Sequence, residues 1–164
     1  MGSGKTSVGR RVADHLGWPF RDSDREIEAA TGLSVRELGE RDGIDAMHAL
    51  EAQHVLDALA DPAPSVIAAA AFTIEVAEVR GALLRPEIVP FWLRAEPHVL
   101  ASRFTRGPHR PWYGDSPEAF LAVHAARRHP LFAAVDPIVI DVGRARPPAV
   151  AARAIEALAS IGSR

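Results

Sequence analysis

The stretch Gly2-Ser3-Gly4-Lys5-Thr6, followed directly by a helical pattern of apolar residues, decides the fold. It matches the second half of the motif G-x-x-x-x-G-K-[ST], in which backbone amides and the start of a helix bind phosphate groups. Glycine lets the backbone approach the phosphate oxygens, a lysine ammonium reaches the outer phosphates, and a hydroxyl ligates Mg²⁺. The sequence therefore predicts a nucleotide-phosphate site at the beginning of this helix.

Composition agrees with one globular domain over residues 1–164. Hydrophobic residues make up 48% and charged residues 24% of the chain, and the net charge is -2, which argues against a disordered tail or a basic nucleic-acid-binding arm. No apolar stretch approaches the ~18–20 residues of a membrane span. The chain has no cysteine and no signal-peptide pattern. We therefore expect a cytoplasmic protein, a monomer or weak homo-oligomer, without nucleic-acid or membrane partners.

Short apolar segments alternate with helical patterns along the chain, which is typical of βαβ units and a parallel sheet. Strands are expected over residues 18–21, 65–71, 88–93 and 137–142. Helices are expected over residues 5–16, 24–30, 34–40, 45–60, 74–84, 97–104, 117–127 and 147–161. Residues 106–115 contain two prolines, two glycines and several cationic side chains, and this composition predicts a long exposed loop.

The phosphate-binding motif is incomplete in this sequence. Counting back from Lys5, its first glycine would lie two positions before Met1, and the strand that launches the loop would lie further upstream. In doubly wound sheets that strand is usually central and buried on both faces. We therefore expect an α/β fold whose first, central strand is missing, and a sequence that is short at its N-terminus, for instance through a miscalled start codon.

These residues resemble the shikimate kinases, a family of small P-loop kinases, and the likeness is collinear over nearly the whole chain. Residues 1–6 correspond to the family's G-x-M-G-x-G-K-[ST] without its first two positions, and Asp22-Ser23-Asp24 corresponds to its D-x-D. The resemblance implies a three-layer P-loop kinase fold, with ATP as phosphoryl donor and Mg²⁺ held by Thr6 and Asp22. It implies that Lys5 is a catalytic residue and that Asp24 hydrogen-bonds the acceptor hydroxyl, either to orient it or to act as its base. The expected phosphate-binding residues are Gly2, Ser3, Gly4, Lys5 and Thr6.

Other family motifs lie further along the chain. Arg110-Pro111 matches the R-P of a closing lid, here about residues 106–116, and the resemblance implies that Arg110 contacts the transferring phosphate. Arg103 corresponds to an arginine that stacks on adenine, and Arg146 and Pro147 lie in the adenine-side loop before the last helix. Residues 127–132 resemble K-R-x-P-L-Y, which makes Arg128 a substrate-carboxylate arginine.

The expected acceptor site departs from the family pattern at two places. The family's phenylalanine-arginine pair, whose arginine binds the acceptor carboxylate, is replaced by Met47-His48. The triple glycine after the third strand is replaced by alanines around residues 68–71, followed by Phe72. A histidine binds an anion strongly only when protonated and offers no bidentate contact. His48 is the expected substrate-binding residue at the first of these places.

Three hypotheses for the function remain open. The leading one is ATP-dependent transfer of a phosphoryl group to a hydroxyl of a small anionic metabolite, for which the family's acceptor is shikimate. The second is a kinase for another polyol or sugar acid, such as a gluconate-like acceptor. The third is a degenerate nucleotide-binding module without turnover. A P-loop switch or motor ATPase is disfavoured, because the strand at residues 66–71 ends in alanines rather than in an acidic residue.

Overall fold

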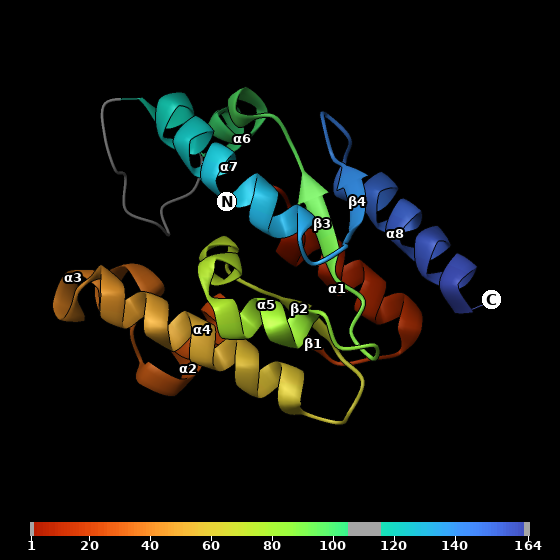
Figure 1. The fold of residues 1–164 in the computed structure, drawn as a ribbon, viewed down its shortest axis with the longest axis horizontal. Helices are drawn as coiled ribbons and strands as arrows, with labels where there is room; N and C mark the ends of the chain where they lie inside the picture. Colours follow the sequence, from red (N-terminus) through yellow and green to blue (C-terminus); the bar gives the residue numbers. More distant parts are fainter. Residues whose placement is uncertain (1, 105–115, 163–164) are drawn as a thin grey trace.

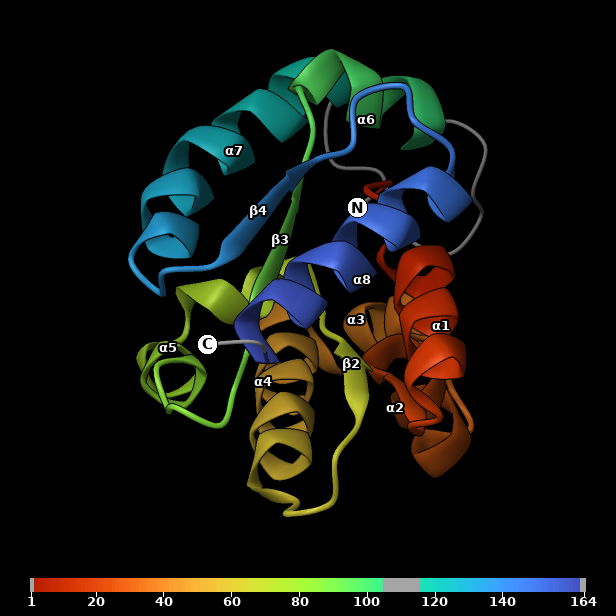
Figure 2. The ribbon, with the colours of Figure 1, turned by 90° about the vertical axis from the view of Figure 1, so that its right-hand side faces the viewer.

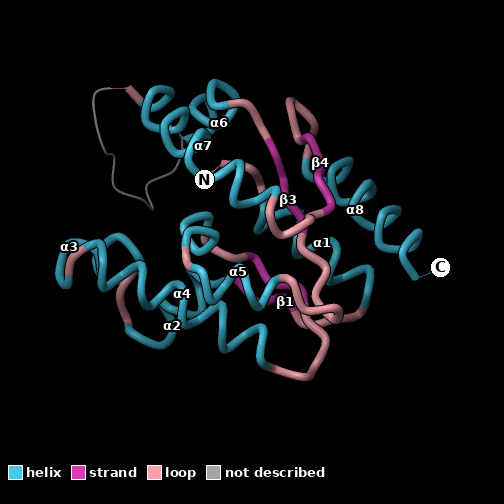
Figure 3. Tube along the Cα trace, viewed as in Figure 1, coloured by secondary structure: helices cyan, strands magenta, loops and turns pink. Residues whose placement is uncertain are grey.

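The computed structural model describes residues 2–104 and 116–162, and helices make up most of it (Figures 1 and 3). None of the described helices is long and apolar enough to cross a membrane. The elements in chain order are α1 (Lys5–Leu16), β1 (Phe20–Asp22), α2 (Ser23–Thr31), α3 (Val35–Asp42), α4 (Ile44–Ala60), β2 (Val66–Ala68), the 3₁₀ helix η1 (Ala71–Glu75), α5 (Ala77–Leu83), β3 (Phe91–Arg94), α6 (Pro97–Phe104), α7 (Pro117–Ala133), β4 (Ile138–Asp141) and α8 (Pro147–Gly162).

The four described strands form two parallel pairs. In the first pair, Phe20 of β1 lies opposite Val66 of β2. In the second, β3 and β4 run in register from Phe91 opposite Ile138 to Arg94 opposite Asp141. No hydrogen-bonded ladder joins β2 to β3 in the described part of the chain. A largely apolar cleft of about 410 Å³ lies between the pairs, and side chains of both β2 and β3 line it.

Helices cover both faces of the strands, as the sequence pattern predicted (Figures 1 and 2). On one face α1 packs against α8, and Val12 and Ala154 belong to the same buried cluster as Ile140 of β4. On the other face α4 packs against α5, and Val55 and Val79 form a second cluster that Ile67 of β2 joins. The arrangement is therefore an α/β fold in which the strands lie between two helical layers.

The helix expected over residues 74–84 is divided in the structure, and this expectation was wrong. Both the backbone amide and the hydroxyl of Thr73 donate to the carbonyl oxygen of Ala70, the hydroxyl at 2.8 Å. This i to i+3 spacing is that of a 3₁₀ turn, so η1 forms first and α5 begins only at Ala77. The strand expected over residues 65–71 ends at Ala68, because the chain turns into η1.

The helix expected over residues 117–127 continues to Ala133, so its predicted end was also wrong. Pro130 lies inside the helix and removes one amide donor, which usually ends or kinks a helix. Here Trp92 of β3 makes ring contacts with His129 at 4.9 Å and with Phe132 at 5.2 Å. These contacts pack the last turn against the sheet and offset the lost hydrogen bond.

Gly9 allows α1 to lie close to β1. A Cβ atom at this position would be 2.7 Å from Cε2 of Phe20. We expect Gly9→Ala to lower the free energy of unfolding by about 1–3 kcal/mol, because overpacking exceeds the gain in helix propensity. The matched control is Gly81→Ala in α5, where nothing lies within 4 Å of the added atom and where the same change should stabilise the protein.

Urea unfolding of the two variants beside the parent protein measures both effects. An equal stabilisation by the two substitutions would contradict the close contact between α1 and Phe20.

Candidate active site

The loop before α1 depends on glycine. Gly2 has φ 71° and Gly4 has φ 85°, in the left-handed region that side chains disfavour. Gly2 also lies against α6, since an added Cβ would be 3.3 Å from the carbonyl oxygen of Leu100. Conformation therefore favours glycine at both positions, and the close approach of α6 favours it further at Gly2.

The N-terminus of α1 faces this loop with its amides uncapped by side chains. Gly4 is the N-cap residue and provides no side-chain hydrogen bond, and the first turn holds no acidic residue. The first amides of a helix and the positive end of its dipole together bind anions. Lys5 and Thr6 lie in this first turn, so the structure places an ammonium and a hydroxyl beside the free amides.

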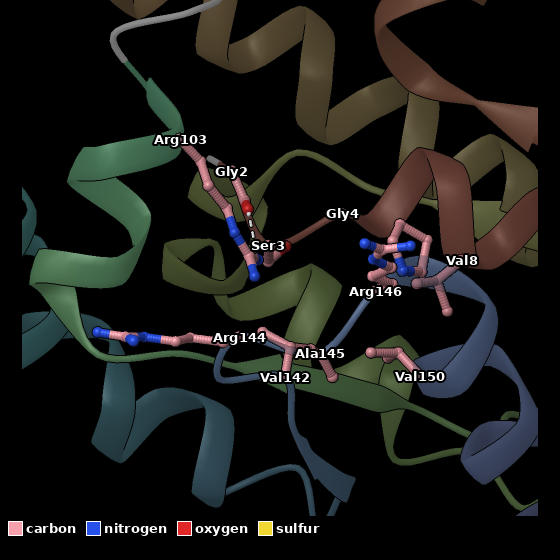
Figure 4. Close-up of a pocket in the computed structure, with 11 residues that line it drawn as sticks. Gly2, Ser3, Gly4, Val8, Arg103, Val142, Arg144, Ala145, Arg146 and Val150 are labelled. Atoms are coloured by element: carbon pink, nitrogen blue, oxygen red, sulfur yellow. Dashed lines mark hydrogen bonds between the residues drawn. The ribbon is translucent and has the colours of Figure 1, made fainter.

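A cavity of about 300 Å³ opens beside the loop (Figure 4). Its walls come from the loop, from α6 and from the connection between β4 and α8. Six of the eight residues expected to bind the nucleotide line it, namely Gly2, Ser3, Gly4, Arg103, Arg146 and Pro147. Lys5 lines the neighbouring cleft, and Thr6 does not line either cavity. Val142, Ala145 and Val150 form an apolar wall of this cavity. They lie within the segment 141–150 that resembles the adenine-side loop, but sequence reasoning did not single them out.

Arg103 connects two walls of this cavity. Its Nη1 donates to the carbonyl oxygen of Gly2 at 3.3 Å, and its Nη2 donates to that of Gly143 at 2.7 Å. Figure 4 shows the side chain reaching the loop at Gly2. The guanidinium therefore holds the phosphate loop and the β4–α8 connection together in this structure.

Asp22 and Asp24 lie where β1 ends and α2 begins. Asp22 is the N-cap residue of α2 and is buried, whereas Asp24 is half-buried in the first turn. Ser23 between them is fully buried, and its hydroxyl donates to the carbonyl oxygen of Ala68 at 2.8 Å. This bond ties the carboxyl ends of β1 and β2 together and so fixes the two carboxylates at one edge. Sequence reasoning missed Ser23, although a small hydroxyl between two aspartates at a strand end is a usable signal.

The expected metal ligands are chemically suited to Mg²⁺. Thr6 and Asp22 offer a hydroxyl and a carboxylate, and Mg²⁺ usually takes one or two such protein ligands together with water and substrate phosphates. No group of three or more histidine, aspartate or glutamate side chains with metal-binding geometry occurs among the described residues. The donors present thus fit a cation that is held mainly by the nucleotide, rather than a closed protein cage.

The larger cleft brings together residues from distant parts of the chain. Ser3 and Lys5 line it, together with Thr73 of η1 and with His124 and Arg128 of α7. The pKa of His124 is lowered by burial and by the nearby positive charges of α7, which favours the neutral ring. The structure therefore places the predicted substrate arginine and the predicted catalytic lysine on one cavity.

His48, which departs from the family pattern, contacts Phe72, the residue that follows the alanine segment at residues 68–71. The rings of His48 and Phe72 are stacked, with centroids 3.5 Å apart and an interplanar angle of 6°. In the sequence, His48 and Phe72 lie in separate segments, and nothing there indicated that they are in contact. Arg110 and the rest of the predicted lid as far as residue 115 lie outside the described residues.

The shikimate kinase family model matches residues 1–159. The chain belongs to the shikimate kinase family. A shikimate kinase of Caulobacter vibrioides is 41% identical over 81% of this chain and 66% of its own length, so the chain spans slightly less than two thirds of that relative. A shikimate kinase of Ruegeria pomeroyi is 36% identical over 98% of this chain and 82% of its own length. The comparisons confirm the family resemblance drawn from the motifs.

Solved structures agree with the fold. A shikimate kinase from Acinetobacter baumannii, solved in complex with shikimate, superposes with a TM-score of 0.88 at 27% identity, over 98% of this chain and 89% of that one. The shikimate kinase from Bacteroides thetaiotaomicron gives a TM-score of 0.82 at 22% identity, over 96% and 93% of the two chains. The second similarity supports the fold alone.

Proposed function

We propose that this chain transfers the terminal phosphoryl group of ATP to a hydroxyl of shikimate. The observation that carries the proposal is the position of the two cavities. The cavity beside the phosphate loop and the cleft that contains Arg128 share Ser3 and Val8 as lining residues. A nucleotide in the first cavity and an acceptor in the second would therefore meet at the loop, as phosphoryl transfer requires.

The described residues would divide the chemistry among them. The amides of the loop and the ammonium of Lys5 would bind the phosphates and neutralise charge on the transferring group. Thr6 and Asp22 would hold Mg²⁺, which supplies further positive charge when bound. Asp24 would accept the proton of the acceptor hydroxyl while the oxygen of that hydroxyl bonds to the γ-phosphorus. The bond between the γ-phosphorus and the oxygen that bridges it to the β-phosphate would break, and ADP would leave.

The remaining predicted residues would bind the two substrates. Arg103, Arg146 and Pro147 would surround the base and sugar of ATP, because they line the cavity beside the loop. Arg128 would bind the acceptor carboxylate from the cleft. His48 of α4, which is stacked on Phe72 and lines neither cavity, stays a predicted substrate-binding residue. Arg110 would contact the transferring phosphoryl group from the lid.

A kinase for another polyol or sugar acid is the second candidate. The stack of His48 on Phe72 favours it, because His48 stands where the family has an arginine and its ring packs on the residue that follows the alanines replacing the family's glycines. ADP release with shikimate, with gluconate and without acceptor distinguishes the candidates, and we expect stimulation by shikimate. Bound MgATP without stimulation by either acceptor would identify a nucleotide-binding module that no longer turns over.

We also infer that the two strand pairs are parts of one sheet that lacks its central strand. The facing strands β2 and β3 contribute Val66 and Leu93 to the apolar cleft, and Val12 of α1 also lines it. A strand with apolar side chains on both faces would fit the cleft between β2 and β3. Fusing an apolar strand-forming segment before Gly2 should slow amide exchange in β2 and β3, whereas the same segment with a central proline should not. Equal exchange in both fusions would contradict the inference.

A further inference from the structure

Glu75, at the end of η1, accepts hydrogen bonds from two successive arginines of α7. The Nε of Arg128 donates to its Oε1 at 2.6 Å, and an Nη2 hydrogen of Arg127 binds its Oε2. The side chains of Glu75 and Arg128 are only 15% and 14% exposed, whereas that of Arg127 is 58% exposed. The ion pair between Glu75 and Arg128 is therefore largely shielded from solvent, which favours one defined geometry.

Electrostatics keep the carboxylate of Glu75 ionised. Burial by itself raises the pKa of Glu75, but the hydrogen bonds from Arg127 and Arg128 outweigh this effect, so the net shift of the pKa is downward. One carboxylate between two guanidinium groups leaves the cluster with a net positive charge. An anionic acceptor would therefore still be attracted to Arg128, although Glu75 is bound to it.

The contact with Glu75 uses only one side of the Arg128 guanidinium. A guanidinium can bind a carboxylate through Nε and one Nη, or through its two Nη groups. Glu75 binds at Nε, and no acceptor within the described residues is hydrogen-bonded to Nη1 or Nη2 of Arg128. Because Arg128 also lines the cleft with Lys5, its remaining hydrogen-bond donors are available to a molecule bound there.

We infer that Glu75 is a positioning residue for the acceptor site, which fixes the guanidinium of Arg128 so that its Nη groups serve the acceptor carboxylate. This inference rests on the proposed function. The motif analysis did not single out Glu75, because the contact joins η1 to a helix more than fifty residues further along the chain. The 3₁₀ turn set by Thr73 carries Glu75 into this position.

The test compares Glu75→Ala and Glu75→Gln with the parent protein in steady-state kinetics. We expect Glu75→Ala to raise KM for shikimate about tenfold, the loss of roughly one well-oriented charged contact, with kcat and KM for ATP changed less than about twofold. Glu75→Gln keeps an oxygen that can accept the Nε hydrogen bond, so it should recover most of the lost affinity. The matched control is Glu78→Gln on the exposed side of α5, which should leave all three constants unchanged.

Several outcomes would overturn the inference. An unchanged or lower KM for shikimate in Glu75→Ala would mean that Glu75 does not orient Arg128 or competes with the acceptor. Equal losses toward shikimate and ATP, without recovery in Glu75→Gln, would indicate a merely structural role.

A second measurement is independent of turnover. The Nε–H resonance of Arg128 in NMR spectra should be protected from exchange in the parent protein and in Glu75→Gln, and exposed in Glu75→Ala. The absence of this difference would overturn the inference even if shikimate proves not to be the acceptor. A parent protein that neither binds nor phosphorylates shikimate, but shows the protected resonance, would contradict the proposed function and the acceptor role while retaining the ion pair.

Discussion

Lys5→Ala is expected to lower kcat by about 10²–10³-fold, the usual loss when one preorganised charged or hydrogen-bonding group at the reacting centre is removed. Lys5 begins α1 beside uncapped amides and lines the cleft shared with Arg128. In the proposed function its ammonium would lie where charge develops on the transferring phosphoryl group. The measurement is the rate of ADP formation at saturating MgATP and shikimate, with thermal unfolding of the variant as a check of its fold.

Lys5→Arg is the informative companion variant. Lys5 is the only lysine among 19 basic residues, so arginine serves at every other basic position of the chain. We expect Lys5→Arg to remain strongly impaired, because a planar guanidinium does not replace a compact ammonium on a flexible stem. Activity of Lys5→Ala within about threefold of the parent protein would contradict the catalytic role that we propose for this residue.

The elements of the fold that the sequence predicted well are those whose bounds are set by residues close to them in the chain. The predicted bounds of α1, residues 5–16, are confirmed. A glycine stands at each end of the helix, and Gly4 and Gly17 both adopt left-handed backbone conformations. Each of the four expected strands was found and is shorter than expected, and β1 and β3 each end one residue later than predicted. The division of the chain at η1 could not be predicted from periodicity, because it depends on the side chain of Thr73 bonding to the backbone.

In the candidate site, too, the sequence indicated the residues of contiguous motifs but not the contacts between distant residues. The loop residues and the adenine-side residues follow from contiguous motifs, and the structure brings six of them to one cavity. Contacts across the fold had no comparable signal in one sequence. The stack of His48 on Phe72 and the bond of Glu75 to Arg128 join residues 24 and 53 positions apart. Sequence therefore named residues for the proposed acceptor site but not the contacts between them.

Asp24→Asn should reduce kcat by about 10²–10⁴-fold, the range expected when a general base is lost, while KM for ATP changes little. Asparagine has nearly the shape of aspartate and can still bind the acceptor hydroxyl, but it cannot take up the proton. The carboxylate lies in the first turn of α2, directly after the end of β1. Glu28→Gln, at an exposed position of the same helix, is the control and should retain full activity.

The comparison of Asp22 with Asp24 separates two roles that neighbouring carboxylates can share. If Asp22 acts through Mg²⁺, the activity of Asp22→Asn should depend more steeply on Mg²⁺ concentration than that of the parent protein. The activity of Asp24→Asn should stay low at every Mg²⁺ concentration, because its defect lies in proton transfer. Rescue of Asp24→Asn by added Mg²⁺ would contradict this division of roles. It would mean that both carboxylates, on either side of the buried hydrogen bond from Ser23 to Ala68, act through the metal.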